Sequence, residues 1–175
     1  EGTDFATVTD ITIASGDTTG TAVFNPTEDN LYDASSAESA VIAISGVSGG
    51  SATESGTQTA SISITDGDSA PTVTLASSAS SVGEGESALT LTATLSVATY
   101  ANVVVSIDVT GGTGTDGSDF KTGSDITISA GSTSGTTSFT PIDDSGTYED
   151  TETAVIAISS VSGGSASESG TQTTT

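Results

Sequence analysis

The sequence predicts an all-β fold made of tandem immunoglobulin-like antiparallel sandwiches, with about seven strands per unit and no helices of note. Apolar residues alternate with Ser and Thr along several runs, which is typical of half-buried antiparallel strands. Clusters of Gly, Ser, Asp and Asn separate these runs and indicate turns. No stretch combines a helical period with helix-forming residues. Together these observations favour a β-sandwich.

The clearest strand is expected over Ala88–Val97, where every second residue is apolar and Thr occupies the opposite face. A second strand is expected over Asn102–Thr110, and shorter strands over Asp125–Ser129 and Thr153–Ser159. The glycine-rich segment Gly111–Gly117 is expected to be a loop, because no helix follows and no Lys closes it as in a phosphate-binding loop. The apolar faces of the four expected strands consist of Leu89, Leu91, Ala93 and Leu95, then Val103, Val105, Ile107 and Val109, then Ile126 and Ile128, then Ala154, Ile156 and Ile158.

The chain also resembles itself. Residues 1–26 match residues 116–141 at an offset of 115, and residues 40–59 match residues 154–173 at an offset of 114. Self-similarity at a fixed spacing predicts a tandem repeat. We therefore expect residues 1–69 to be the C-terminal part of one unit, and residues 70–175 to be a second unit that lacks its last strand. We expect the parent to be a longer array, or the ends to be completed by a neighbouring chain.

The net charge of the chain limits the classes of partner that it is expected to bind. There are 23 acidic residues and a single basic residue, Lys121, for a formal net charge of -22. Such a field repels nucleic acids and anionic lipid surfaces, so neither is an expected partner. No apolar run is long enough for a membrane span, so direct membrane insertion is not expected. The absence of Cys and His excludes disulfides, thiolate and imidazole metal sites, and catalysis that depends on these side chains.

One stretch concentrates the acidic charge. Ile142–Glu152 holds five carboxylates in eleven residues and no Lys or Arg. Carboxylates a few ångströms apart repel each other, and a divalent cation with about six to eight oxygen ligands reverses that cost. Oxygen ligands suit hard cations such as Ca²⁺. The alternative interpretation is that these side chains are simply the solvated surface of an acidic protein.

Four acidic clusters in a fixed order resemble the Calx-beta domain. They are SVGEGES, GSDF, PIDDSGTYEDTETAVIAIS and ITDGD. That family occurs in sodium–calcium exchangers, in an integrin tail and as tandem repeats in large bacterial surface proteins. The resemblance implies a sandwich with Ca²⁺ at one tip, although TDGD departs from a run of three consecutive Asp. The implied ligands are Glu84, Asp119, Asp143, Asp144, Glu149 and Glu152 in the second unit, and Asp4, Glu28, Asp29, Asp33, Glu38, Asp66 and Asp68 in the first.

The expected function is structural and non-catalytic. We expect a calcium-stiffened spacer in a tandem array or filament of an extracellular or cell-surface adhesive protein of bacterial origin. The short segment Ser69–Pro71 would join the units, and Pro71 would limit its freedom. The expected partners are neighbouring repeats of the same chain and other copies of the chain joined by strand addition.

Two other functions stay open. The acidic tip could form a ligand-binding module that recognises carbohydrate or a cationic protein. Paired carboxylates such as Glu149 and Glu152 could act as the acid and base of a glycosidase. The second alternative is the weaker one, because few aromatic residues are present to stack a sugar and catalysis rarely needs a site copied in every repeat.

Overall fold

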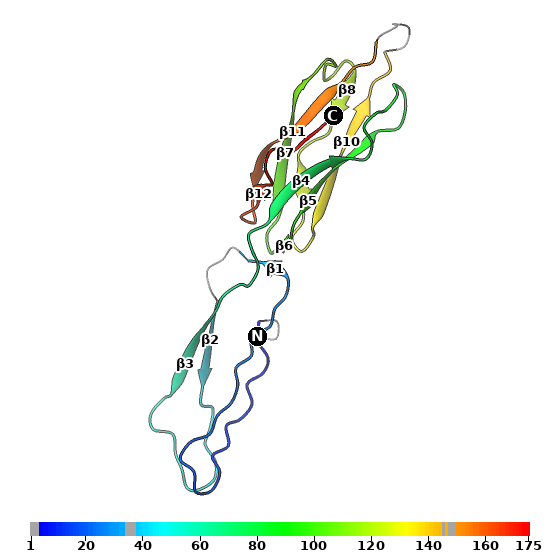
Figure 1. Ribbon diagram of the computed structural model, residues 1–175. Coiled ribbons are helices and arrows are strands. Elements are labelled where there is room, and N and C mark those ends of the chain that lie inside the picture. The colour runs from blue at the N-terminus through cyan, green and yellow to red at the C-terminus, as the bar shows by residue number, and fades with distance from the viewer. Residues whose placement is uncertain (1–3, 34–37, 145, 147–149) are drawn as a thin grey trace. The chain divides into compact units, whose positions relative to one another are not determined.

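The computed structural model describes residues 4–33, 38–144, 146 and 150–175, and every regular element within them is a β-strand (Figure 1). The all-β prediction is therefore confirmed. In the described part of the chain, no helix offers the length and apolarity needed to cross a membrane. The chain divides into two compact units. Unit 1 comprises Glu1–Asp29 and Ser35–Gly67, and unit 2 comprises Asn30–Ala34 and Asp68–Thr175.

Unit 2 contains two facing sheets. The first has the strand order β12-β4-β5-β10-β8, and the second has the order β13-β11-β7-β9. All neighbouring strands in these sheets are antiparallel except β12 and β4, which are parallel. The strand bounds are β4 Thr72–Ser77, β5 Leu89–Leu95, β7 Val103–Gly112, β8 Phe120–Thr122, β9 Ile126–Ile128, β10 Ser134–Pro141, β11 Ala154–Ser162, β12 Ser167–Glu168 and β13 Thr173–Thr174.

The core of unit 2 lies between these two sheets, as in a β-sandwich. Strands β5 and β7 follow the predicted alternation, with every second side chain turned inward. Strand β7 continues to Gly112, so Gly111 and Gly112 belong to a strand and not, as predicted, to a loop. The core consists of Val73, Leu75, Leu91, Ala93, Leu95, Val103, Val105, Ile107, Ile126, Ile128, Ile156 and Ile158.

Strand β11 departs from strict alternation. Its predicted inward residues Ile156 and Ile158 are buried, but the intervening Ala157 is buried as well. The pairing of β11 with β7 shifts register between Val155 and Ile156, and again between Ile158 and Ser160. Both shifts lie outside the stretch Ile156–Ile158, which pairs without interruption, so Ala157 is buried on the opposite face of the strand from the two isoleucines.

A short stretch from the first half of the chain is part of unit 2. Strand β1, Leu31–Tyr32, pairs in parallel with β6, Ala98–Thr99. The backbone N–H of Tyr100 extends this pairing by donating to the carbonyl of Tyr32 at 3.3 Å. Thr99 is 1% exposed, and its hydroxyl donates to the carbonyl of Ala101.

Unit 1 contains one hairpin among its described residues, formed by β2, Glu38–Ala43, and β3, Thr59–Ile64. A single antiparallel bridge joins Phe5 to Pro26. Residues 11–13 have the same sequence as β9 but are not assigned to a strand. The reason is the missing partner: β9 pairs with β7, and no described residue of unit 1 forms an equivalent of β7.

Candidate functional site

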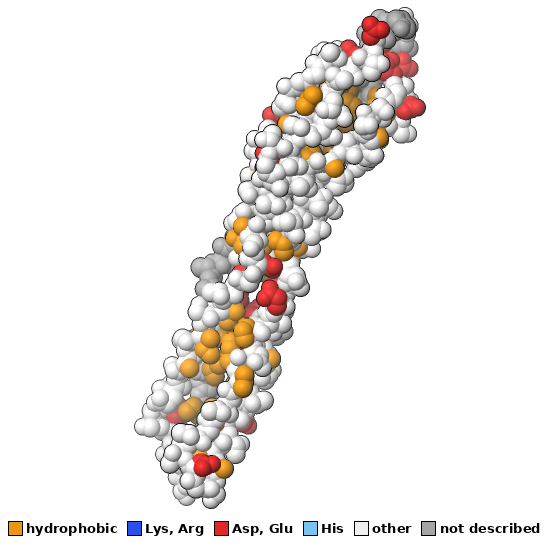
Figure 2. Space-filling model, viewed as in Figure 1, with side chains coloured by type: hydrophobic (Ala, Val, Ile, Leu, Met, Phe, Trp, Pro, Cys, Tyr) orange, Lys and Arg blue, Asp and Glu red, His pale blue; other side chains and the backbone are white. Residues whose placement is uncertain are grey.

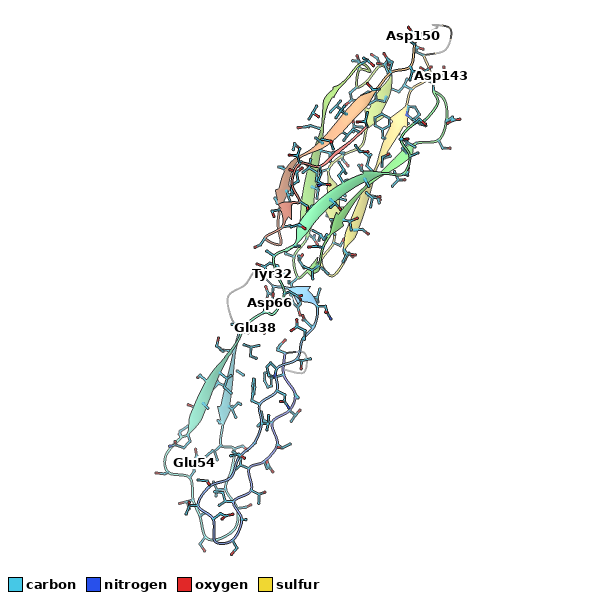
Figure 3. All side chains as sticks on the ribbon, viewed as in Figure 1. Tyr32, Glu38, Glu54, Asp66, Asp143 and Asp150 are labelled. Carbon is cyan, nitrogen blue, oxygen red and sulfur yellow. The ribbon has the colours of Figure 1, made fainter. Side chains whose placement is uncertain are left out.

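The acidic stretch of unit 2 connects β10 to β11 at one end of the sandwich. Figure 3 shows Asp143 and Asp150 at this same end. Asp143, Asp144 and Glu152 are exposed, whereas Asp119 is half-buried. Glu149 lies outside the described residues. Asp143 and Asp144 therefore follow β10, and Glu152 precedes β11, in the segment that joins these two strands.

Asp143 approaches the turn that carries Glu84. Its Oδ2 atom lies 3.5 Å from the position that a Cβ atom on Gly85 would occupy. The turn is closed by Glu86, whose backbone N–H donates to the carbonyl of Gly83 at 3.1 Å, and whose Oε2 accepts from the Gly83 N–H at 3.1 Å. The structure thus brings together two acidic segments that are far apart in the sequence.

A second meeting point is the loop that follows β7. The Oδ2 atom of Asp119 accepts a hydrogen bond from the Thr115 N–H at 2.5 Å. The Oε2 atom of Glu152 lies 3.2 Å from the position that a Cβ atom on Gly114 would occupy. Next to Glu152, the Thr153 N–H donates to the hydroxyl of Thr113 at 3.0 Å. Asp119 therefore holds the shape of this loop, a role that the sequence analysis did not assign to it.

In unit 1, as in unit 2, a predicted ligand from one acidic segment lies beside another acidic segment. The Oε2 atom of Glu28 lies 2.7 Å from the position that a Cβ atom on Gly67 would occupy, beside Asp66 in the TDGD segment. Asp66 and Glu38 lie at the same end of the β2–β3 hairpin (Figure 3). Asp4 is fixed beside the start of the acidic segment, because its carbonyl accepts from the Thr27 N–H at 2.9 Å.

Asp29 also belongs to unit 1, whereas Asp33 and Asp68 are counted in unit 2. Among the residues that the structure describes, no three acidic side chains gather closely enough to hold a metal ion. The donor type fits Ca²⁺, which binds oxygen ligands, and the contacts bring acidic segments together in pairs. The predicted calcium ligands therefore stay a prediction.

Unit 1 also exposes apolar side chains in positions that sequence analysis did not single out (Figure 2). Four of its exposed positions match residues that pair with β7 in unit 2, and we call these four the open strand site. They are Ile11, Ile13, Val41 and Ile44, which are 59%, 56%, 64% and 46% exposed. Their matches in unit 2 are Ile126, Ile128, Val155 and Ile158. Comparing the two matched segments for a missing strand could have found this site.

A cavity of about 270 Å³ lies within unit 1 and includes one residue of the open strand site. It is lined by Asp4 and Phe5, by the run Glu38–Val41, and by Ile64. Its walls therefore come from three segments: the start of the chain, strand β2 and the end of strand β3. The lining combines two carboxylate-bearing residues, Asp4 and Glu38, with apolar side chains such as Phe5 and Ile64.

Comparison with known proteins assigns no function to these features. The chain matches no protein family model, no curated protein and no solved structure.

Proposed function

We propose that this chain is a non-catalytic structural segment, a spacer whose β units are placed in series and whose acidic loops bind Ca²⁺. The observation that supports this most directly is the recurrence of local contacts at matched positions. The Gln58 N–H donates to Glu54 Oε1 at 2.8 Å, and the matching Gln172 N–H donates to Glu168 Oε1 at 2.5 Å. A chain that builds the same substructure twice is suited to a serial array, in which each unit contacts its neighbours.

The hairpins of the two units agree in register as well. Ile42 pairs with Ala60 in unit 1, and the matching Ile156 pairs with Thr174 in unit 2. The next backbone hydrogen bond is also the same in both units. The Ile44 N–H donates to the Gln58 carbonyl, and the Ile158 N–H donates to the Gln172 carbonyl, both at 3.3 Å. This agreement extends the support for a repeated structural module.

The calcium part of the proposal is supported by charge and by donor chemistry. A single Lys faces 23 carboxylates, so the chain cannot neutralise its own acidic loops. Asp143 lies beside the turn of Glu84, and Glu28 lies beside the segment of Asp66. A divalent ion shared by such segments would attract both and restrain the loops that carry them. Because Ca²⁺ is abundant outside cells, the proposal includes an extracellular or cell-surface location on a bacterial adhesin or filament.

Calcium binding is tested by thermal unfolding with and without a chelator. Ca²⁺ at millimolar concentration is expected to raise the melting temperature, because a ligand that binds only the folded state stabilises it by mass action. Asp143→Asn and Glu28→Gln should each reduce this increase. Asp108→Asn is the matched control, because Asp108 is an exposed acidic residue on β7 outside the acidic loops.

The stiffening itself is tested by small-angle scattering of the same samples. The scattering curve is expected to change when Ca²⁺ is removed, as loops held by the ion become freer. Calorimetry that detects no binding at millimolar Ca²⁺, together with a melting temperature that ignores the chelator, would refute the calcium part of the proposal.

A further inference from the structure

We propose that Asp66–Gly67 is a site of spontaneous covalent modification, at which Asp66 converts to isoaspartate through a succinimide. This inference goes beyond the proposed structural function and does not rest on it. The chain contains a second Asp-Gly pair, Asp116–Gly117. The local structure favours the reaction at Asp66 and opposes it at Asp116.

The reaction takes place between a side chain and the next backbone nitrogen. The nitrogen of Gly67 attacks Cγ of the protonated Asp66 carboxyl group, and the new N–Cγ bond closes the succinimide ring. The amide proton and the Cγ hydroxyl group leave together as water. Hydrolysis adds a water back at either ring carbonyl and yields Asp or isoaspartate, so no oxidant or reductant is needed. Glycine favours the attack because it has no Cβ atom to block the close approach.

The sequence limits this chemistry to two strong candidates. Asp66 and Asp116 are the aspartates that precede a glycine, and no Asn precedes one. All four residues of the two pairs are exposed. Because the two dipeptides are identical, a difference between their rates in the folded chain has to come from the structure around them.

The structure holds both reacting groups of Asp116–Gly117. The Gly117 N–H donates to the carbonyl of Phe120 at 2.7 Å, and Asp116 forms a β-bridge with Phe120. The carboxylate of Asp116 accepts from the Thr122 N–H at 3.4 Å and from the Thr122 hydroxyl at 3.2 Å. The nitrogen and the carboxyl group must therefore leave these partners before they meet, which slows the reaction.

The backbone around Asp66–Gly67 lacks this turn. Strand β3 ends at Ile64, and neither Asp66 nor Gly67 belongs to a strand. Among the residues that the structure describes, no backbone carbonyl accepts a hydrogen bond from the Gly67 N–H. Backbone outside the hydrogen-bonded ladders changes its torsion angles at a lower cost, as the attack on Cγ requires.

The product would alter an acidic segment of unit 1. In isoaspartate the main chain runs through Cγ, so the backbone gains a carbon atom and the free carboxylate moves to Cα. The Oε2 atom of Glu28 lies 2.7 Å from the position that a Cβ atom on Gly67 would occupy. The change therefore takes place where two acidic segments lie side by side.

The test incubates the folded chain at physiological temperature and pH in the presence of a chelator. Digestion after glutamate places Asp66 and Asp116 on separate peptides, residues 55–84 and 87–149. Mass spectrometry with electron-transfer fragmentation distinguishes isoaspartate from Asp in each peptide. Isoaspartate is expected to form at Asp66 at least about tenfold faster than at Asp116, because hydrogen bonds must first break at Asp116.

The matched control is the same chain unfolded in urea, in which the two identical dipeptides should react at similar rates. In the folded chain, Gly67→Ala should slow the reaction at Asp66 at least about fivefold, because a Cβ atom hinders the attack. This variant should keep the melting temperature, since Gly67 has no positive φ and the added atom meets only the flexible end of Glu28.

Equal rates at the two sites of the folded chain, or a faster reaction at Asp116, would overturn the proposal. So would a folded chain that forms no isoaspartate at Asp66 during a time in which the unfolded chain does. Because a chelator is present throughout, these outcomes are independent of whether the acidic loops bind Ca²⁺.

Discussion

Residues 11–13 of unit 1 and residues 126–128 of unit 2 have the same sequence, Ile-Thr-Ile, but different structural environments. In unit 2 both isoleucines are 0% exposed and the segment is strand β9, whereas in unit 1 they are 59% and 56% exposed and no strand is assigned. The sequence of a segment does not decide its burial. Burial depends on whether β7, or an equivalent strand, lies beside it.

The turns of the two units behave differently from these strands. Ser51 and Ser165 match in sequence and have φ angles of 55° and 52°. The Asp17 N–H donates to the Ala14 carbonyl at 3.0 Å, and the matching Ser132 N–H donates to the Ser129 carbonyl at 2.9 Å. Turn geometry is set by bonds between residues close in the sequence, so it persists where the sheet is incomplete.

The largest expected difference concerns the two matched isoleucines. Ile126→Ala should lower the free energy of unfolding by about 2–5 kcal/mol, because it opens a cavity in a closed core. Ile11→Ala should cost less than about 1 kcal/mol, because its side chain is exposed. Chemical denaturation followed by circular dichroism measures both values, and equal losses would contradict the comparison.

Two matched glycines, Gly135 and Gly20, provide a second comparison of the stability of the two units. A Cβ atom on Gly135 would lie 2.5 Å from the carbonyl oxygen of Thr127, and one on Gly20 would lie 2.4 Å from that of Thr12. Gly135→Ala should cost about 1–3 kcal/mol, because β10 is held in the sheet by its pairing with β5.

The Gly20→Ala change should cost less, although its clash is equally close. Residues 11–13 are not fixed in a ladder and have more freedom to move away from the added methyl group. The melting temperatures of the two variants provide the measurement. A larger loss for Gly20→Ala would indicate that this part of unit 1 is as rigid as its match in unit 2.

The smallest expected difference concerns the carboxylates that bond the two matched glutamines. Glu168→Ala should destabilise the chain by about 1 kcal/mol, because it removes a partly buried hydrogen bond to the Gln172 N–H. Glu54→Ala should cost only a few tenths of that, because the bond to the Gln58 N–H is exposed to water. Thermal unfolding of both variants in one buffer measures the two destabilisations. A larger decrease in stability for Glu54→Ala than for Glu168→Ala would contradict the prediction.

Much of the fold could be predicted from the sequence where the pattern was local. The alternation over Ala88–Val97 and Asn102–Thr110 predicted β5 and β7 with the correct inward faces, because side-chain direction follows a period of two. The burial of Ala157 could not be predicted from this period, because Ala157 lies on the opposite face of the strand from the buried Ile156 and Ile158. The exposure of Ile11 could not be predicted either, because burial at this position depends on pairing with another strand, as the matching Ile126 pairs with Val105 of β7.

The candidate site was predictable to a lesser degree. The resemblance implied that Asp143 and Glu84 are both calcium ligands, which stays a prediction, although Asp143 does lie near the turn at Gly85. It did not reveal that Asp119 is used to hold a loop through the Thr115 N–H. The sequence analysis expected residues 1–69 to be an incomplete unit, but it did not name the exposed residues of the open strand site, because an aliphatic residue looks the same in the sequence whether or not another strand covers it.

The pairing of β1 with β6 has a practical consequence for dissecting the molecule. Leu31 and Tyr32 precede β2 in the chain but pair with Ala98 and Thr99 of unit 2. A protease that cleaved only after Gly67 would leave β1 on the fragment that carries unit 1, and so would strip unit 2 of a native pairing. Fragments designed from linear order alone will therefore underestimate the stability of the second half, unless residues 30–34 are supplied in trans.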